Sequence, residues 1–281
     1  AVVSRLGIRP DFAAKLRSLE RFDVALLLDD SGSMSLSTAD AHAPSHGARS
    51  AHGAHGRAGE STRWSKLLES VSSLFEICRS TSGRPVDAFF LNRAAVPGVT
   101  DASQLRAAFA AKPYGFTPLT RVFRRALATG RAPDGSRARP LLVVIMTDGL
   151  PTDDDGEDEI APFLAELRAL PPDVHVQLVA CAEASECLHY VHDAERELSS
   201  RLDVSDLYPL ERARVLARHV RQGGSEAAFA FSYGDYLSRA LLAPIDPEVA
   251  ALDHSAEEDA AAAARAPAGA GAARGACLRQ T

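Results

Sequence analysis

The fold of this chain is decided by the stretch Phe22-Asp-Val-Ala-Leu-Leu-Leu-Asp-Asp-Ser-Gly-Ser-Met34. Its first part, Val24 to Leu28, is a continuous apolar run, which is typical of a strand buried on both faces in a parallel sheet. The run ends at Asp29, and Ser31 and Ser33 follow at alternate positions. The glycine between the two serines lets the backbone bend tightly, so the three side chains can converge on one point. Because such oxygens suit a hard cation, the stretch predicts a strand followed by a loop that binds Mg2+ or Mn2+.

Two later segments place further oxygen-bearing side chains next to regular elements. In Gly115-Phe-Thr117-Pro-Leu, the threonine precedes a proline and a helical pattern, which predicts Thr117 as the N-cap with proline at the first helical position. A second interpretation is that the Thr117 hydroxyl reaches the metal, and the two roles are compatible. The apolar run Leu141 to Met146 predicts a second central strand, with Asp148 just after its end. Ligands of open α/β sheets bind at the carboxyl ends of strands, so adjacency of the two central strands would bring Asp29 and Asp148 together.

With these pieces in this order, the chain resembles the von Willebrand factor A (vWA) domains. Asp29-x-Ser31-x-Ser33, Thr117 and Asp148 resemble the metal-ion-dependent adhesion site (MIDAS) of that family. The resemblance implies a doubly wound, mostly parallel α/β sheet of about six strands flanked by helices. It also implies that Ser31, Ser33 and Thr117 contact a Mg2+ (or Mn2+) directly, whereas Asp29 and Asp148 act through water.

The resemblance further implies a protein-interaction module. When neutral hydroxyls and water surround a divalent cation, much of its charge is uncompensated, and a Glu or Asp carboxylate of a partner protein can bind it. A helix N-terminus beside Thr117 would also favour an anion. Because domains of this family mostly bind proteins, and many act inside cells in larger assemblies, we expect a subunit or adaptor of a multi-subunit complex.

Two other functions stay open at this stage. The first is a structural scaffold subunit that keeps the fold and never uses the metal. The second is a metal-dependent hydrolase in which Asp29 or Asp30 activates water. The sequence contains no phosphate-binding glycine loop, no Ser–His–Asp set and no cysteine nucleophile. We therefore expect a protein without catalytic activity.

Composition sets limits on partners and compartment. The 281 residues carry a net charge of -6 and no basic cluster with interleaved aromatic residues, which argues against nucleic-acid binding. No run approaches the roughly 18 apolar residues of a membrane span.

The start, Ala1-Val-Val-Ser-Arg, is no signal peptide and lacks a methionine, so removal of an earlier targeting segment is compatible with it. The cysteines form neither a disulfide framework nor a zinc pattern, although Cys181 and Cys187 could pair. We expect an intracellular protein, in the cytoplasm or an organelle lumen. The cysteines are Cys78, Cys181, Cys187 and Cys277.

The pattern divides the chain into an accessory segment at residues 1–20, a vWA-like domain at 21–253 and an Ala/Gly-rich disordered tail at 254–281. Within the domain, residues 36–60 contain almost no large apolar side chain, so we expect a flexible insertion beside the metal loop. This insertion holds four histidines whose spacing matches no familiar set of metal ligands. They are His42, His46, His52 and His55.

A dense acidic loop follows the second central strand. Residues 153–159 carry six carboxylates in seven positions, Asp153-Asp-Asp-Gly-Glu-Asp-Glu159. One interpretation is a solvated loop before a helix, where acids are favoured in any case. The other is a second cation site or a surface that sets specificity for a partner.

Overall fold

The structure, a computed structural model, describes residues 2–38, 61–182, 188–198, 201–255 and 257. Most of the insertion predicted at residues 36–60, with all four of its histidines, lies outside the described residues. Cys187, Cys277 and most of the tail predicted at residues 254–281 also lie outside them.

The described residues contain a six-stranded sheet with the order β3-β2-β1-β4-β5-β6. Neighbouring strands are parallel except for β2 and β3, which pair antiparallel at one margin. Because the chain starts in the middle of the sheet and winds outward to both sides, the fold is a doubly wound α/β fold, as predicted. The strands are β1 (Asp23–Leu28), β2 (Val86–Phe90), β3 (Val96–Val99), β4 (Leu141–Thr147), β5 (Val174–Ala180) and β6 (Leu202–Ser205).

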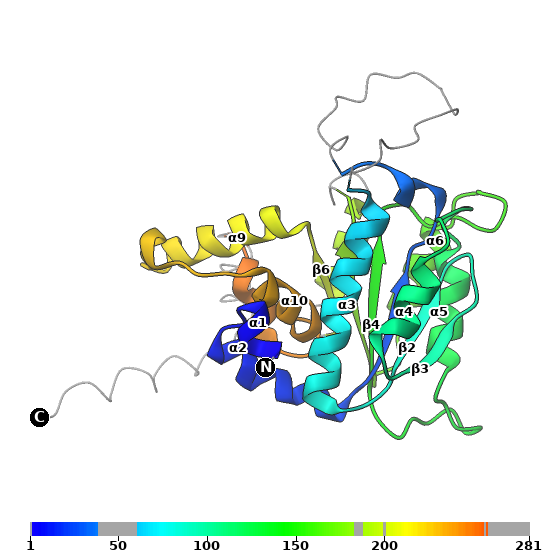
Figure 1. Cartoon of the computed structure of the whole chain (residues 1–281), viewed down its shortest axis with the longest axis horizontal. Coiled ribbons are helices and arrows are strands. Elements are labelled where there is room, and N and C mark those ends of the chain that lie inside the picture. The colour runs from blue at the N-terminus through cyan, green and yellow to red at the C-terminus, as the bar shows by residue number, and fades with distance from the viewer. Residues whose placement is uncertain (1, 39–60, 183–187, 199–200, 256, 258–281) are drawn as a thin grey trace, which may run out of the picture.

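Helices cover both faces of the sheet (Figure 1). Helices α3 and α10 lie over one face, together with α1, α2, α4, α9 and α11, and α5, α6 and α8 lie over the other. No helix of the described segments combines the length and the apolar character needed to cross a membrane. The α-helices are α1 (Val2–Leu6), α2 (Pro10–Lys15), α3 (Arg63–Ser82), α4 (Ala102–Phe109), α5 (Leu119–Ala128), α6 (Ile160–Arg168), α8 (His192–Glu197), α9 (Tyr208–Arg221), α10 (Tyr233–Leu242) and α11 (Pro247–Ala250). Short 3-10 helices are η1 (Leu16–Arg21), η2 (Gly32–Ser35), η4 (His189–Val191), η5 (Glu226–Ala228) and η6 (Ala251–Asp253).

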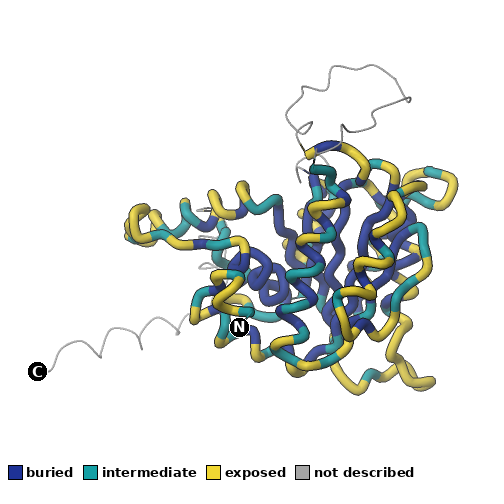
Figure 2. The backbone as a smooth tube through the Cα atoms, viewed as in Figure 1, coloured by how far each residue is buried: buried dark blue, intermediate teal, exposed yellow. Residues whose placement is uncertain are grey.

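The core has two halves, one on each face of the sheet. Along β1, Leu26 and Leu28 belong to the half beneath α3, whereas Ala25 and Leu27 belong to the half beneath α5. Successive side chains of a strand point to opposite faces, so only a continuous apolar run can fill both halves. The tube in Figure 2 is accordingly buried along the central strands. The strand prediction for Val24 to Leu28 is confirmed.

Helix α3 buries Leu67, Val71 and Leu74 in the half of the core that it covers. Thr62 is the N-cap: its side chain accepts a hydrogen bond from the Ser65 backbone N–H, and the Ser65 hydroxyl accepts one from the Thr62 backbone N–H. This reciprocal pair is a capping box. The helix ends at Gly83, whose φ of 67° is the left-handed conformation that glycine adopts without strain. The N-terminus of α3 thus lies at a defined place next to the end of β1.

The N-terminal segment packs into the main core. Phe12 of α2 and Leu16 and Leu19 of η1 are each at most 3% exposed, and they join the half of the core beneath α3 and α10. Lys15 adds an ion pair to Asp246, 2.6 Å from Nζ to the carboxylate, which ties this segment to the region just before α11.

A buried ionic cluster joins the elements at the β6 side of the molecule. Arg239 of α10 is 1% exposed, and its guanidinium lies 3.2 Å from the Asp203 carboxylate, 3.1 Å from Glu211 and 2.6 Å from Asp253. Burial raises the pKa of Glu211 to about 8 and that of Asp203 to about 7, although the Arg239 charge acts in the opposite direction. Glu211 and Asp203 therefore hold protons at a higher pH than free carboxyls do.

Candidate metal centre

The two acids of the predicted site lie together because β1 and β4 are neighbours. Leu28 is the register partner of Met146, and the Asp29 backbone N–H donates to the Met146 carbonyl at 3.0 Å. Asp148 is the residue directly after β4. The chain leaves β1 toward β2 on one side and enters β4 on the other, so this place is the topological switch point where doubly wound folds bind ligands. The predicted adjacency of the strands is confirmed.

Four of the five predicted metal ligands are linked by hydrogen bonds. The Ser31 backbone N–H donates to Asp29 Oδ1 at 2.9 Å, and the Thr147 hydroxyl donates to Asp29 Oδ2 at 2.5 Å. The hydroxyls of Ser31 and Ser33 are 3.0 Å apart, and the Ser33 hydroxyl donates to Asp148 Oδ1 at 2.7 Å. Ser31 and both acids are buried and Ser33 is half-buried. The loop therefore gathers hydroxyl and carboxylate oxygens at one point.

The fifth predicted ligand, Thr117, lies in a loop that packs against the same point. The Gly32 backbone N–H donates to the Gly115 carbonyl at 3.0 Å, which joins the loop to the segment after β1. A Cβ added to Gly149 would stand 3.5 Å from Thr117 Oγ1, so the threonine hydroxyl also borders the segment after β4. Among the described residues, this hydroxyl has no hydrogen-bond partner, which leaves it available to a ligand.

The prediction that Thr117 caps the following helix is wrong. Helix α5 starts at Leu119, its N-cap residue is Pro118, and no side chain caps it. Pro118 has a φ of -72° and a ψ of 57°, which lies outside the helical region, so the first helical residue is Leu119. The Thr117 backbone instead bonds to Thr152: its N–H donates to the Thr152 hydroxyl at 3.0 Å, and its carbonyl accepts from the Thr152 N–H at 2.9 Å.

Electrostatics at the site favour a cation. Asp29 is 1% exposed, and burial, followed by the negative charge of Asp148, raises the pKa of Asp29 to about 6. Two buried carboxyls thus stand close together, and hydrogen bonds alone only partly compensate their charge. A positive charge at this place would be stabilised by both.

Sequence reasoning missed a basic residue that already contacts the site. Arg63, the first residue of α3, lies 2.7 Å from Asp148 Oδ2 through NH1, and its side chain is 16% exposed. The capping box at Thr62 holds the start of α3 in place and so positions this arginine. The pair spans 85 residues of sequence, and no local pattern signals it.

Asp30, considered as a base for hydrolysis, is held by other residues. Its Oδ1 accepts from the Asn92 backbone N–H at 2.7 Å, and its Oδ2 lies 2.5 Å from Arg93 Nε. Arg93 also donates to the Ala108 carbonyl at 2.7 Å, and the Asp30 carbonyl accepts from the Tyr114 N–H at 2.7 Å. Asp30 therefore anchors the loops around the site and is not directed toward a reacting water.

The carboxylates of the acidic loop mainly accept hydrogen bonds from nearby backbone N–H groups. Asp153 Oδ1 accepts from the N–H groups of Asp155 and Glu157, both at 2.9 Å, and Asp158 accepts from the Ile160 N–H at 2.7 Å. Within the described segments, no group of three or more His, Cys, Asp or Glu side chains is placed to hold a metal. Any metal centre in this part of the chain consequently depends on the serine and threonine hydroxyls.

The residues around Asp29 fit a small hard cation. Two serine hydroxyls and two carboxyls lie at the carboxyl ends of β1 and β4, and the Thr117 hydroxyl borders Gly149 there, with no thiolate or imidazole among these five groups. Oxygen donors of this kind are typical of Mg2+ and Mn2+ rather than Zn2+. Bound there, the cation would supply a positive charge and open coordination positions.

Comparisons with known proteins address the fold. The chain matches no protein-family model and no curated protein. Among solved structures it is similar to the manganese-loaded TRAP protein of Plasmodium vivax, with a TM-score of 0.43, 16% identity and coverage of 68% of this chain and 71% of that one. It is also similar to a variant of the PilB minor pilin of Streptococcus sanguinis (TM-score 0.45, 11% identity, 66% of this chain and 57% of that one). A third is the pilus adhesin SpaC of Lactobacillus rhamnosus GG (TM-score 0.41, 15% identity, 66% and 28%). The fold assignment rests on the strand order and registers of this chain itself.

Proposed function

We propose that this chain is a protein-interaction module that binds an acidic side chain of a partner protein through a divalent cation. The observation that carries the proposal is the hydrogen-bonded set of Asp29, Ser31, Ser33 and Asp148 at the switch point, with the Thr117 hydroxyl beside it. The same five residues match the MIDAS pattern of vWA domains, which adds support from resemblance. We propose Mg2+, with Mn2+ as the alternative ion.

The chemistry of the donors explains why a carboxylate is the expected ligand. Ser31, Ser33 and Thr117 bring oxygen atoms without negative charge, and Asp148 shares its charge with Arg63. A divalent cation in this environment keeps a net positive charge, so an incoming anionic oxygen is attracted more strongly than a neutral one. A Glu or Asp of a partner protein provides such an oxygen.

One observation favours a second candidate, the scaffold that keeps the fold without using the metal. The Arg63 guanidinium already gives Asp148 a cationic partner, so part of the buried charge is balanced within the chain. In that case partner binding would not depend on a divalent cation. The two candidates thus differ in one measurable property, which is whether partner binding depends on a divalent cation.

We propose an intracellular location for this module. Cys78 is 1% exposed, and burial raises the pKa of its thiol to about 12, so the thiol is held protonated in the core of α3. Such a thiol is unreactive and needs no oxidising compartment.

Retention of co-purifying proteins tests the proposal. The tagged chain is isolated from its source cells in Mg2+, and the bound proteins are then washed with Mg2+ or with EDTA. We expect EDTA, Thr117→Ala and Ser33→Ala each to release at least one partner that the wild-type chain retains in Mg2+. Thr129→Ala, at an exposed threonine after α5, is the matched control and should retain it. Full retention after EDTA and in both site variants would support the scaffold instead.

A further inference from the structure

A second feature at the same edge of the sheet is a cavity of about 210 Å3. It lies between the first turns of α3, the ends of β4 and β5, and the first residues of α9 and α10. Residues from each of these elements line it: Arg63, Lys66, Met146, Cys181, Tyr208 and Tyr233.

This cavity adjoins the candidate metal centre. Arg63 lines the cavity and also pairs with Asp148 at 2.7 Å. Met146, a further lining residue, is the register partner of Leu28 and accepts from the Asp29 N–H. The cavity and the metal centre therefore share Arg63 and Met146 as neighbours.

The walls of the cavity are apolar and rigid. Tyr208 and Tyr233 meet edge to face with ring centroids 5.3 Å apart, and Tyr233 stacks on Tyr236 at 5.6 Å. Each hydroxyl is already bonded within the protein: Tyr208 to the Phe231 carbonyl, Tyr233 to Ser70, and Tyr236 to the Asp206 carbonyl. Tyr236 is buried, so the rings of Tyr208 and Tyr233 present the surface for contact with apolar groups.

Two cations stand on the α3 side of the cavity. Arg63 lies toward Asp148, and Lys66, one turn further along α3, is exposed and pairs with Glu69 at 2.9 Å. This arrangement complements a ligand that combines an apolar body with negative charge nearby. The volume is below the range of roughly 300–1,000 Å3 typical of small-molecule sites, so it suits a single side chain better than a cofactor.

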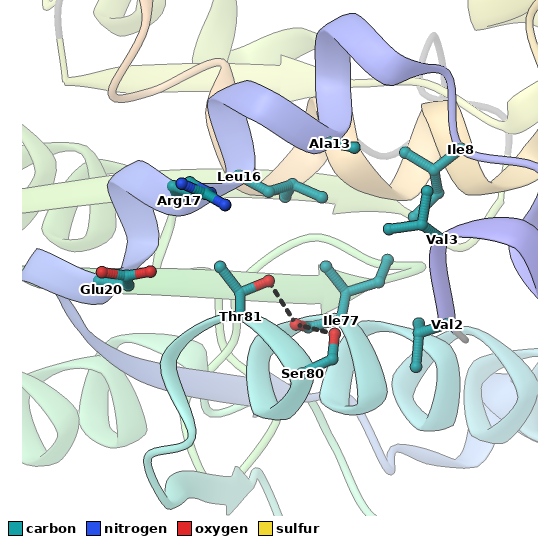
Figure 3. A pocket seen from close by; sticks show the side chains of 10 residues that line it. All are labelled: Val2, Val3, Ile8, Ala13, Leu16, Arg17, Glu20, Ile77, Ser80 and Thr81. Atoms are coloured by element: carbon teal, nitrogen blue, oxygen red, sulfur yellow. Dashed lines mark hydrogen bonds between the residues drawn. The ribbon is translucent and has the colours of Figure 1, made fainter.

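A larger cavity, of about 340 Å3, lies at the other end of α3, away from the candidate metal centre (Figure 3). Val3, Ile8 and Leu16 of the N-terminal segment face Ile77 of α3 there, with Arg17 and Glu20 at one end. Nothing in its surroundings specifies an occupant, whereas the smaller cavity adjoins a site with a proposed ligand.

We infer that the smaller cavity binds an aromatic or large aliphatic side chain of the same partner segment whose acidic residue is bound at the metal centre. This inference rests on the proposed function and narrows it: the recognised segment carries an acid and an apolar anchor at a fixed spacing. A buried anchor of this kind typically contributes much of the affinity of an interface.

The test uses random heptapeptides displayed on phage, selected on the purified chain in Mg2+ and in EDTA. We expect Mg2+-dependent peptides that carry an Asp or Glu together with an aromatic or large aliphatic residue at constant spacing. Replacing that apolar residue by alanine in a synthetic peptide should weaken binding at least about tenfold.

Ala182→Phe tests the location, because Ala182 lines the cavity, is 6% exposed and would fill it with a ring. We expect this variant to lose the apolar preference but keep the acidic one, whereas Ala132→Phe, at an exposed loop position, keeps both. If Ala182→Phe does not fold, Lys66→Glu at the exposed surface serves instead. Selection on Lys66→Glu should enrich fewer peptides with a further acidic residue beside the apolar position. Selection on the control Lys112→Glu should leave the frequency of such peptides unchanged.

The outcomes separate the two proposals. Selection of acidic peptides without an apolar preference would overturn the anchor site and leave the metal centre standing. The same follows if Ala182→Phe leaves the apolar preference unchanged, or if Lys66→Glu leaves the acidic residues beside the apolar position unchanged. Peptides that are equally enriched in EDTA would overturn the metal-dependent function. The effect of Ala182→Phe would then still show whether the cavity binds the apolar residue. A selection that enriches no peptide would overturn both.

Discussion

Arg63 NH1 lies 2.7 Å from Asp148 Oδ2, so the first residue of α3 contacts the acid that follows β4. The Asp148 side chain is fully buried, and its other oxygen accepts from Ser33 at 2.7 Å. A cation of the chain and the proposed Mg2+ would therefore share one carboxylate. We accordingly predict that Arg63 affects metal affinity.

We expect Arg63→Gln to bind Mg2+ more tightly, by roughly tenfold, because a positive charge close to the cation is removed. Isothermal titration of Mg2+ into the metal-free protein measures this change. Arg121→Gln is the control, since Arg121 pairs with Asp154 in the exposed acidic loop at 2.9 Å, and it should leave the affinity unchanged. Weaker Mg2+ binding by Arg63→Gln would mean that the guanidinium supports the site by orienting Asp148.

Mg2+ should stabilise the folded chain. At 100 times its dissociation constant, a ligand that binds only the native state adds about 2.7 kcal/mol to the free energy of unfolding. Melting curves in Mg2+ and in EDTA should differ for the wild type and coincide for Asp29→Ala, whereas Asp154→Ala should behave as the wild type. An equal response of wild type and Asp29→Ala to the chelator would remove Asp29 from the metal site.

Thr117→Ala should remove the response to Mg2+ with little loss of stability in EDTA. The side chain caps no helix, and its hydroxyl bonds to no described residue, so the substitution forfeits no hydrogen bond. Because Thr117 is buried, loss of its methyl group is expected to lower the free energy of unfolding in EDTA by no more than about 1 kcal/mol, as urea unfolding measures. A loss of about 2 kcal/mol or more in EDTA would indicate a structural contact of this hydroxyl instead.

The cluster around Arg239 should make stability depend on pH. In the unfolded chain, Glu211 and Asp203 titrate near pH 4, whereas in the folded chain their pKa values are about 8 and about 7. Between these limits the folded state binds more protons than the unfolded state. The free energy of unfolding is then highest at the acidic end of the window and falls as pH rises toward 8, by up to about 1.4 kcal/mol per pH unit for each proton.

Urea unfolding in EDTA at pH 6 and pH 8.5 measures this dependence. Glu211→Gln keeps the shape of the protonated acid and removes one titrating group, so its stability should fall less over the same interval. Glu226→Gln, in the exposed 3-10 helix η5, should follow the wild type. A Glu211→Gln protein with the full wild-type slope would show that the cluster holds no proton at Glu211.

The strands could be predicted because their sequence pattern is local and strong. Val24 to Leu28 and Leu141 to Met146 are unbroken apolar runs, and only a strand buried on both faces accounts for such runs next to turn residues. The meeting of Asp29 with Asp148 then followed from strand adjacency, which a doubly wound order supplies.

The tertiary pairing of three arginines could not be predicted, for a physical reason. Arg63, Arg93 and Arg239 have long side chains that reach acids far away in sequence, and by residue type each is expected at the surface. Arg239 is nevertheless 1% exposed, because three carboxyls compensate its charge inside the protein. Pairing of this kind depends on tertiary structure and leaves no periodic signal. The prediction of a Thr117 cap failed for a different reason, because Pro118 has a ψ of 57° and the helix starts one residue later.

The margin formed by β3 has a further consequence, for self-association. An exposed strand edge invites another extended chain to add to the sheet, which is a common route to aggregation. β3 is only four residues long, Pro97 within it has no N–H to offer, and Gly98 takes a φ of 62°. At the opposite margin, the Val204 N–H of β6 already donates to the Glu195 side chain at 2.8 Å. Both margins of the sheet are therefore poor templates for a foreign strand, so self-association through the sides of the sheet is disfavoured.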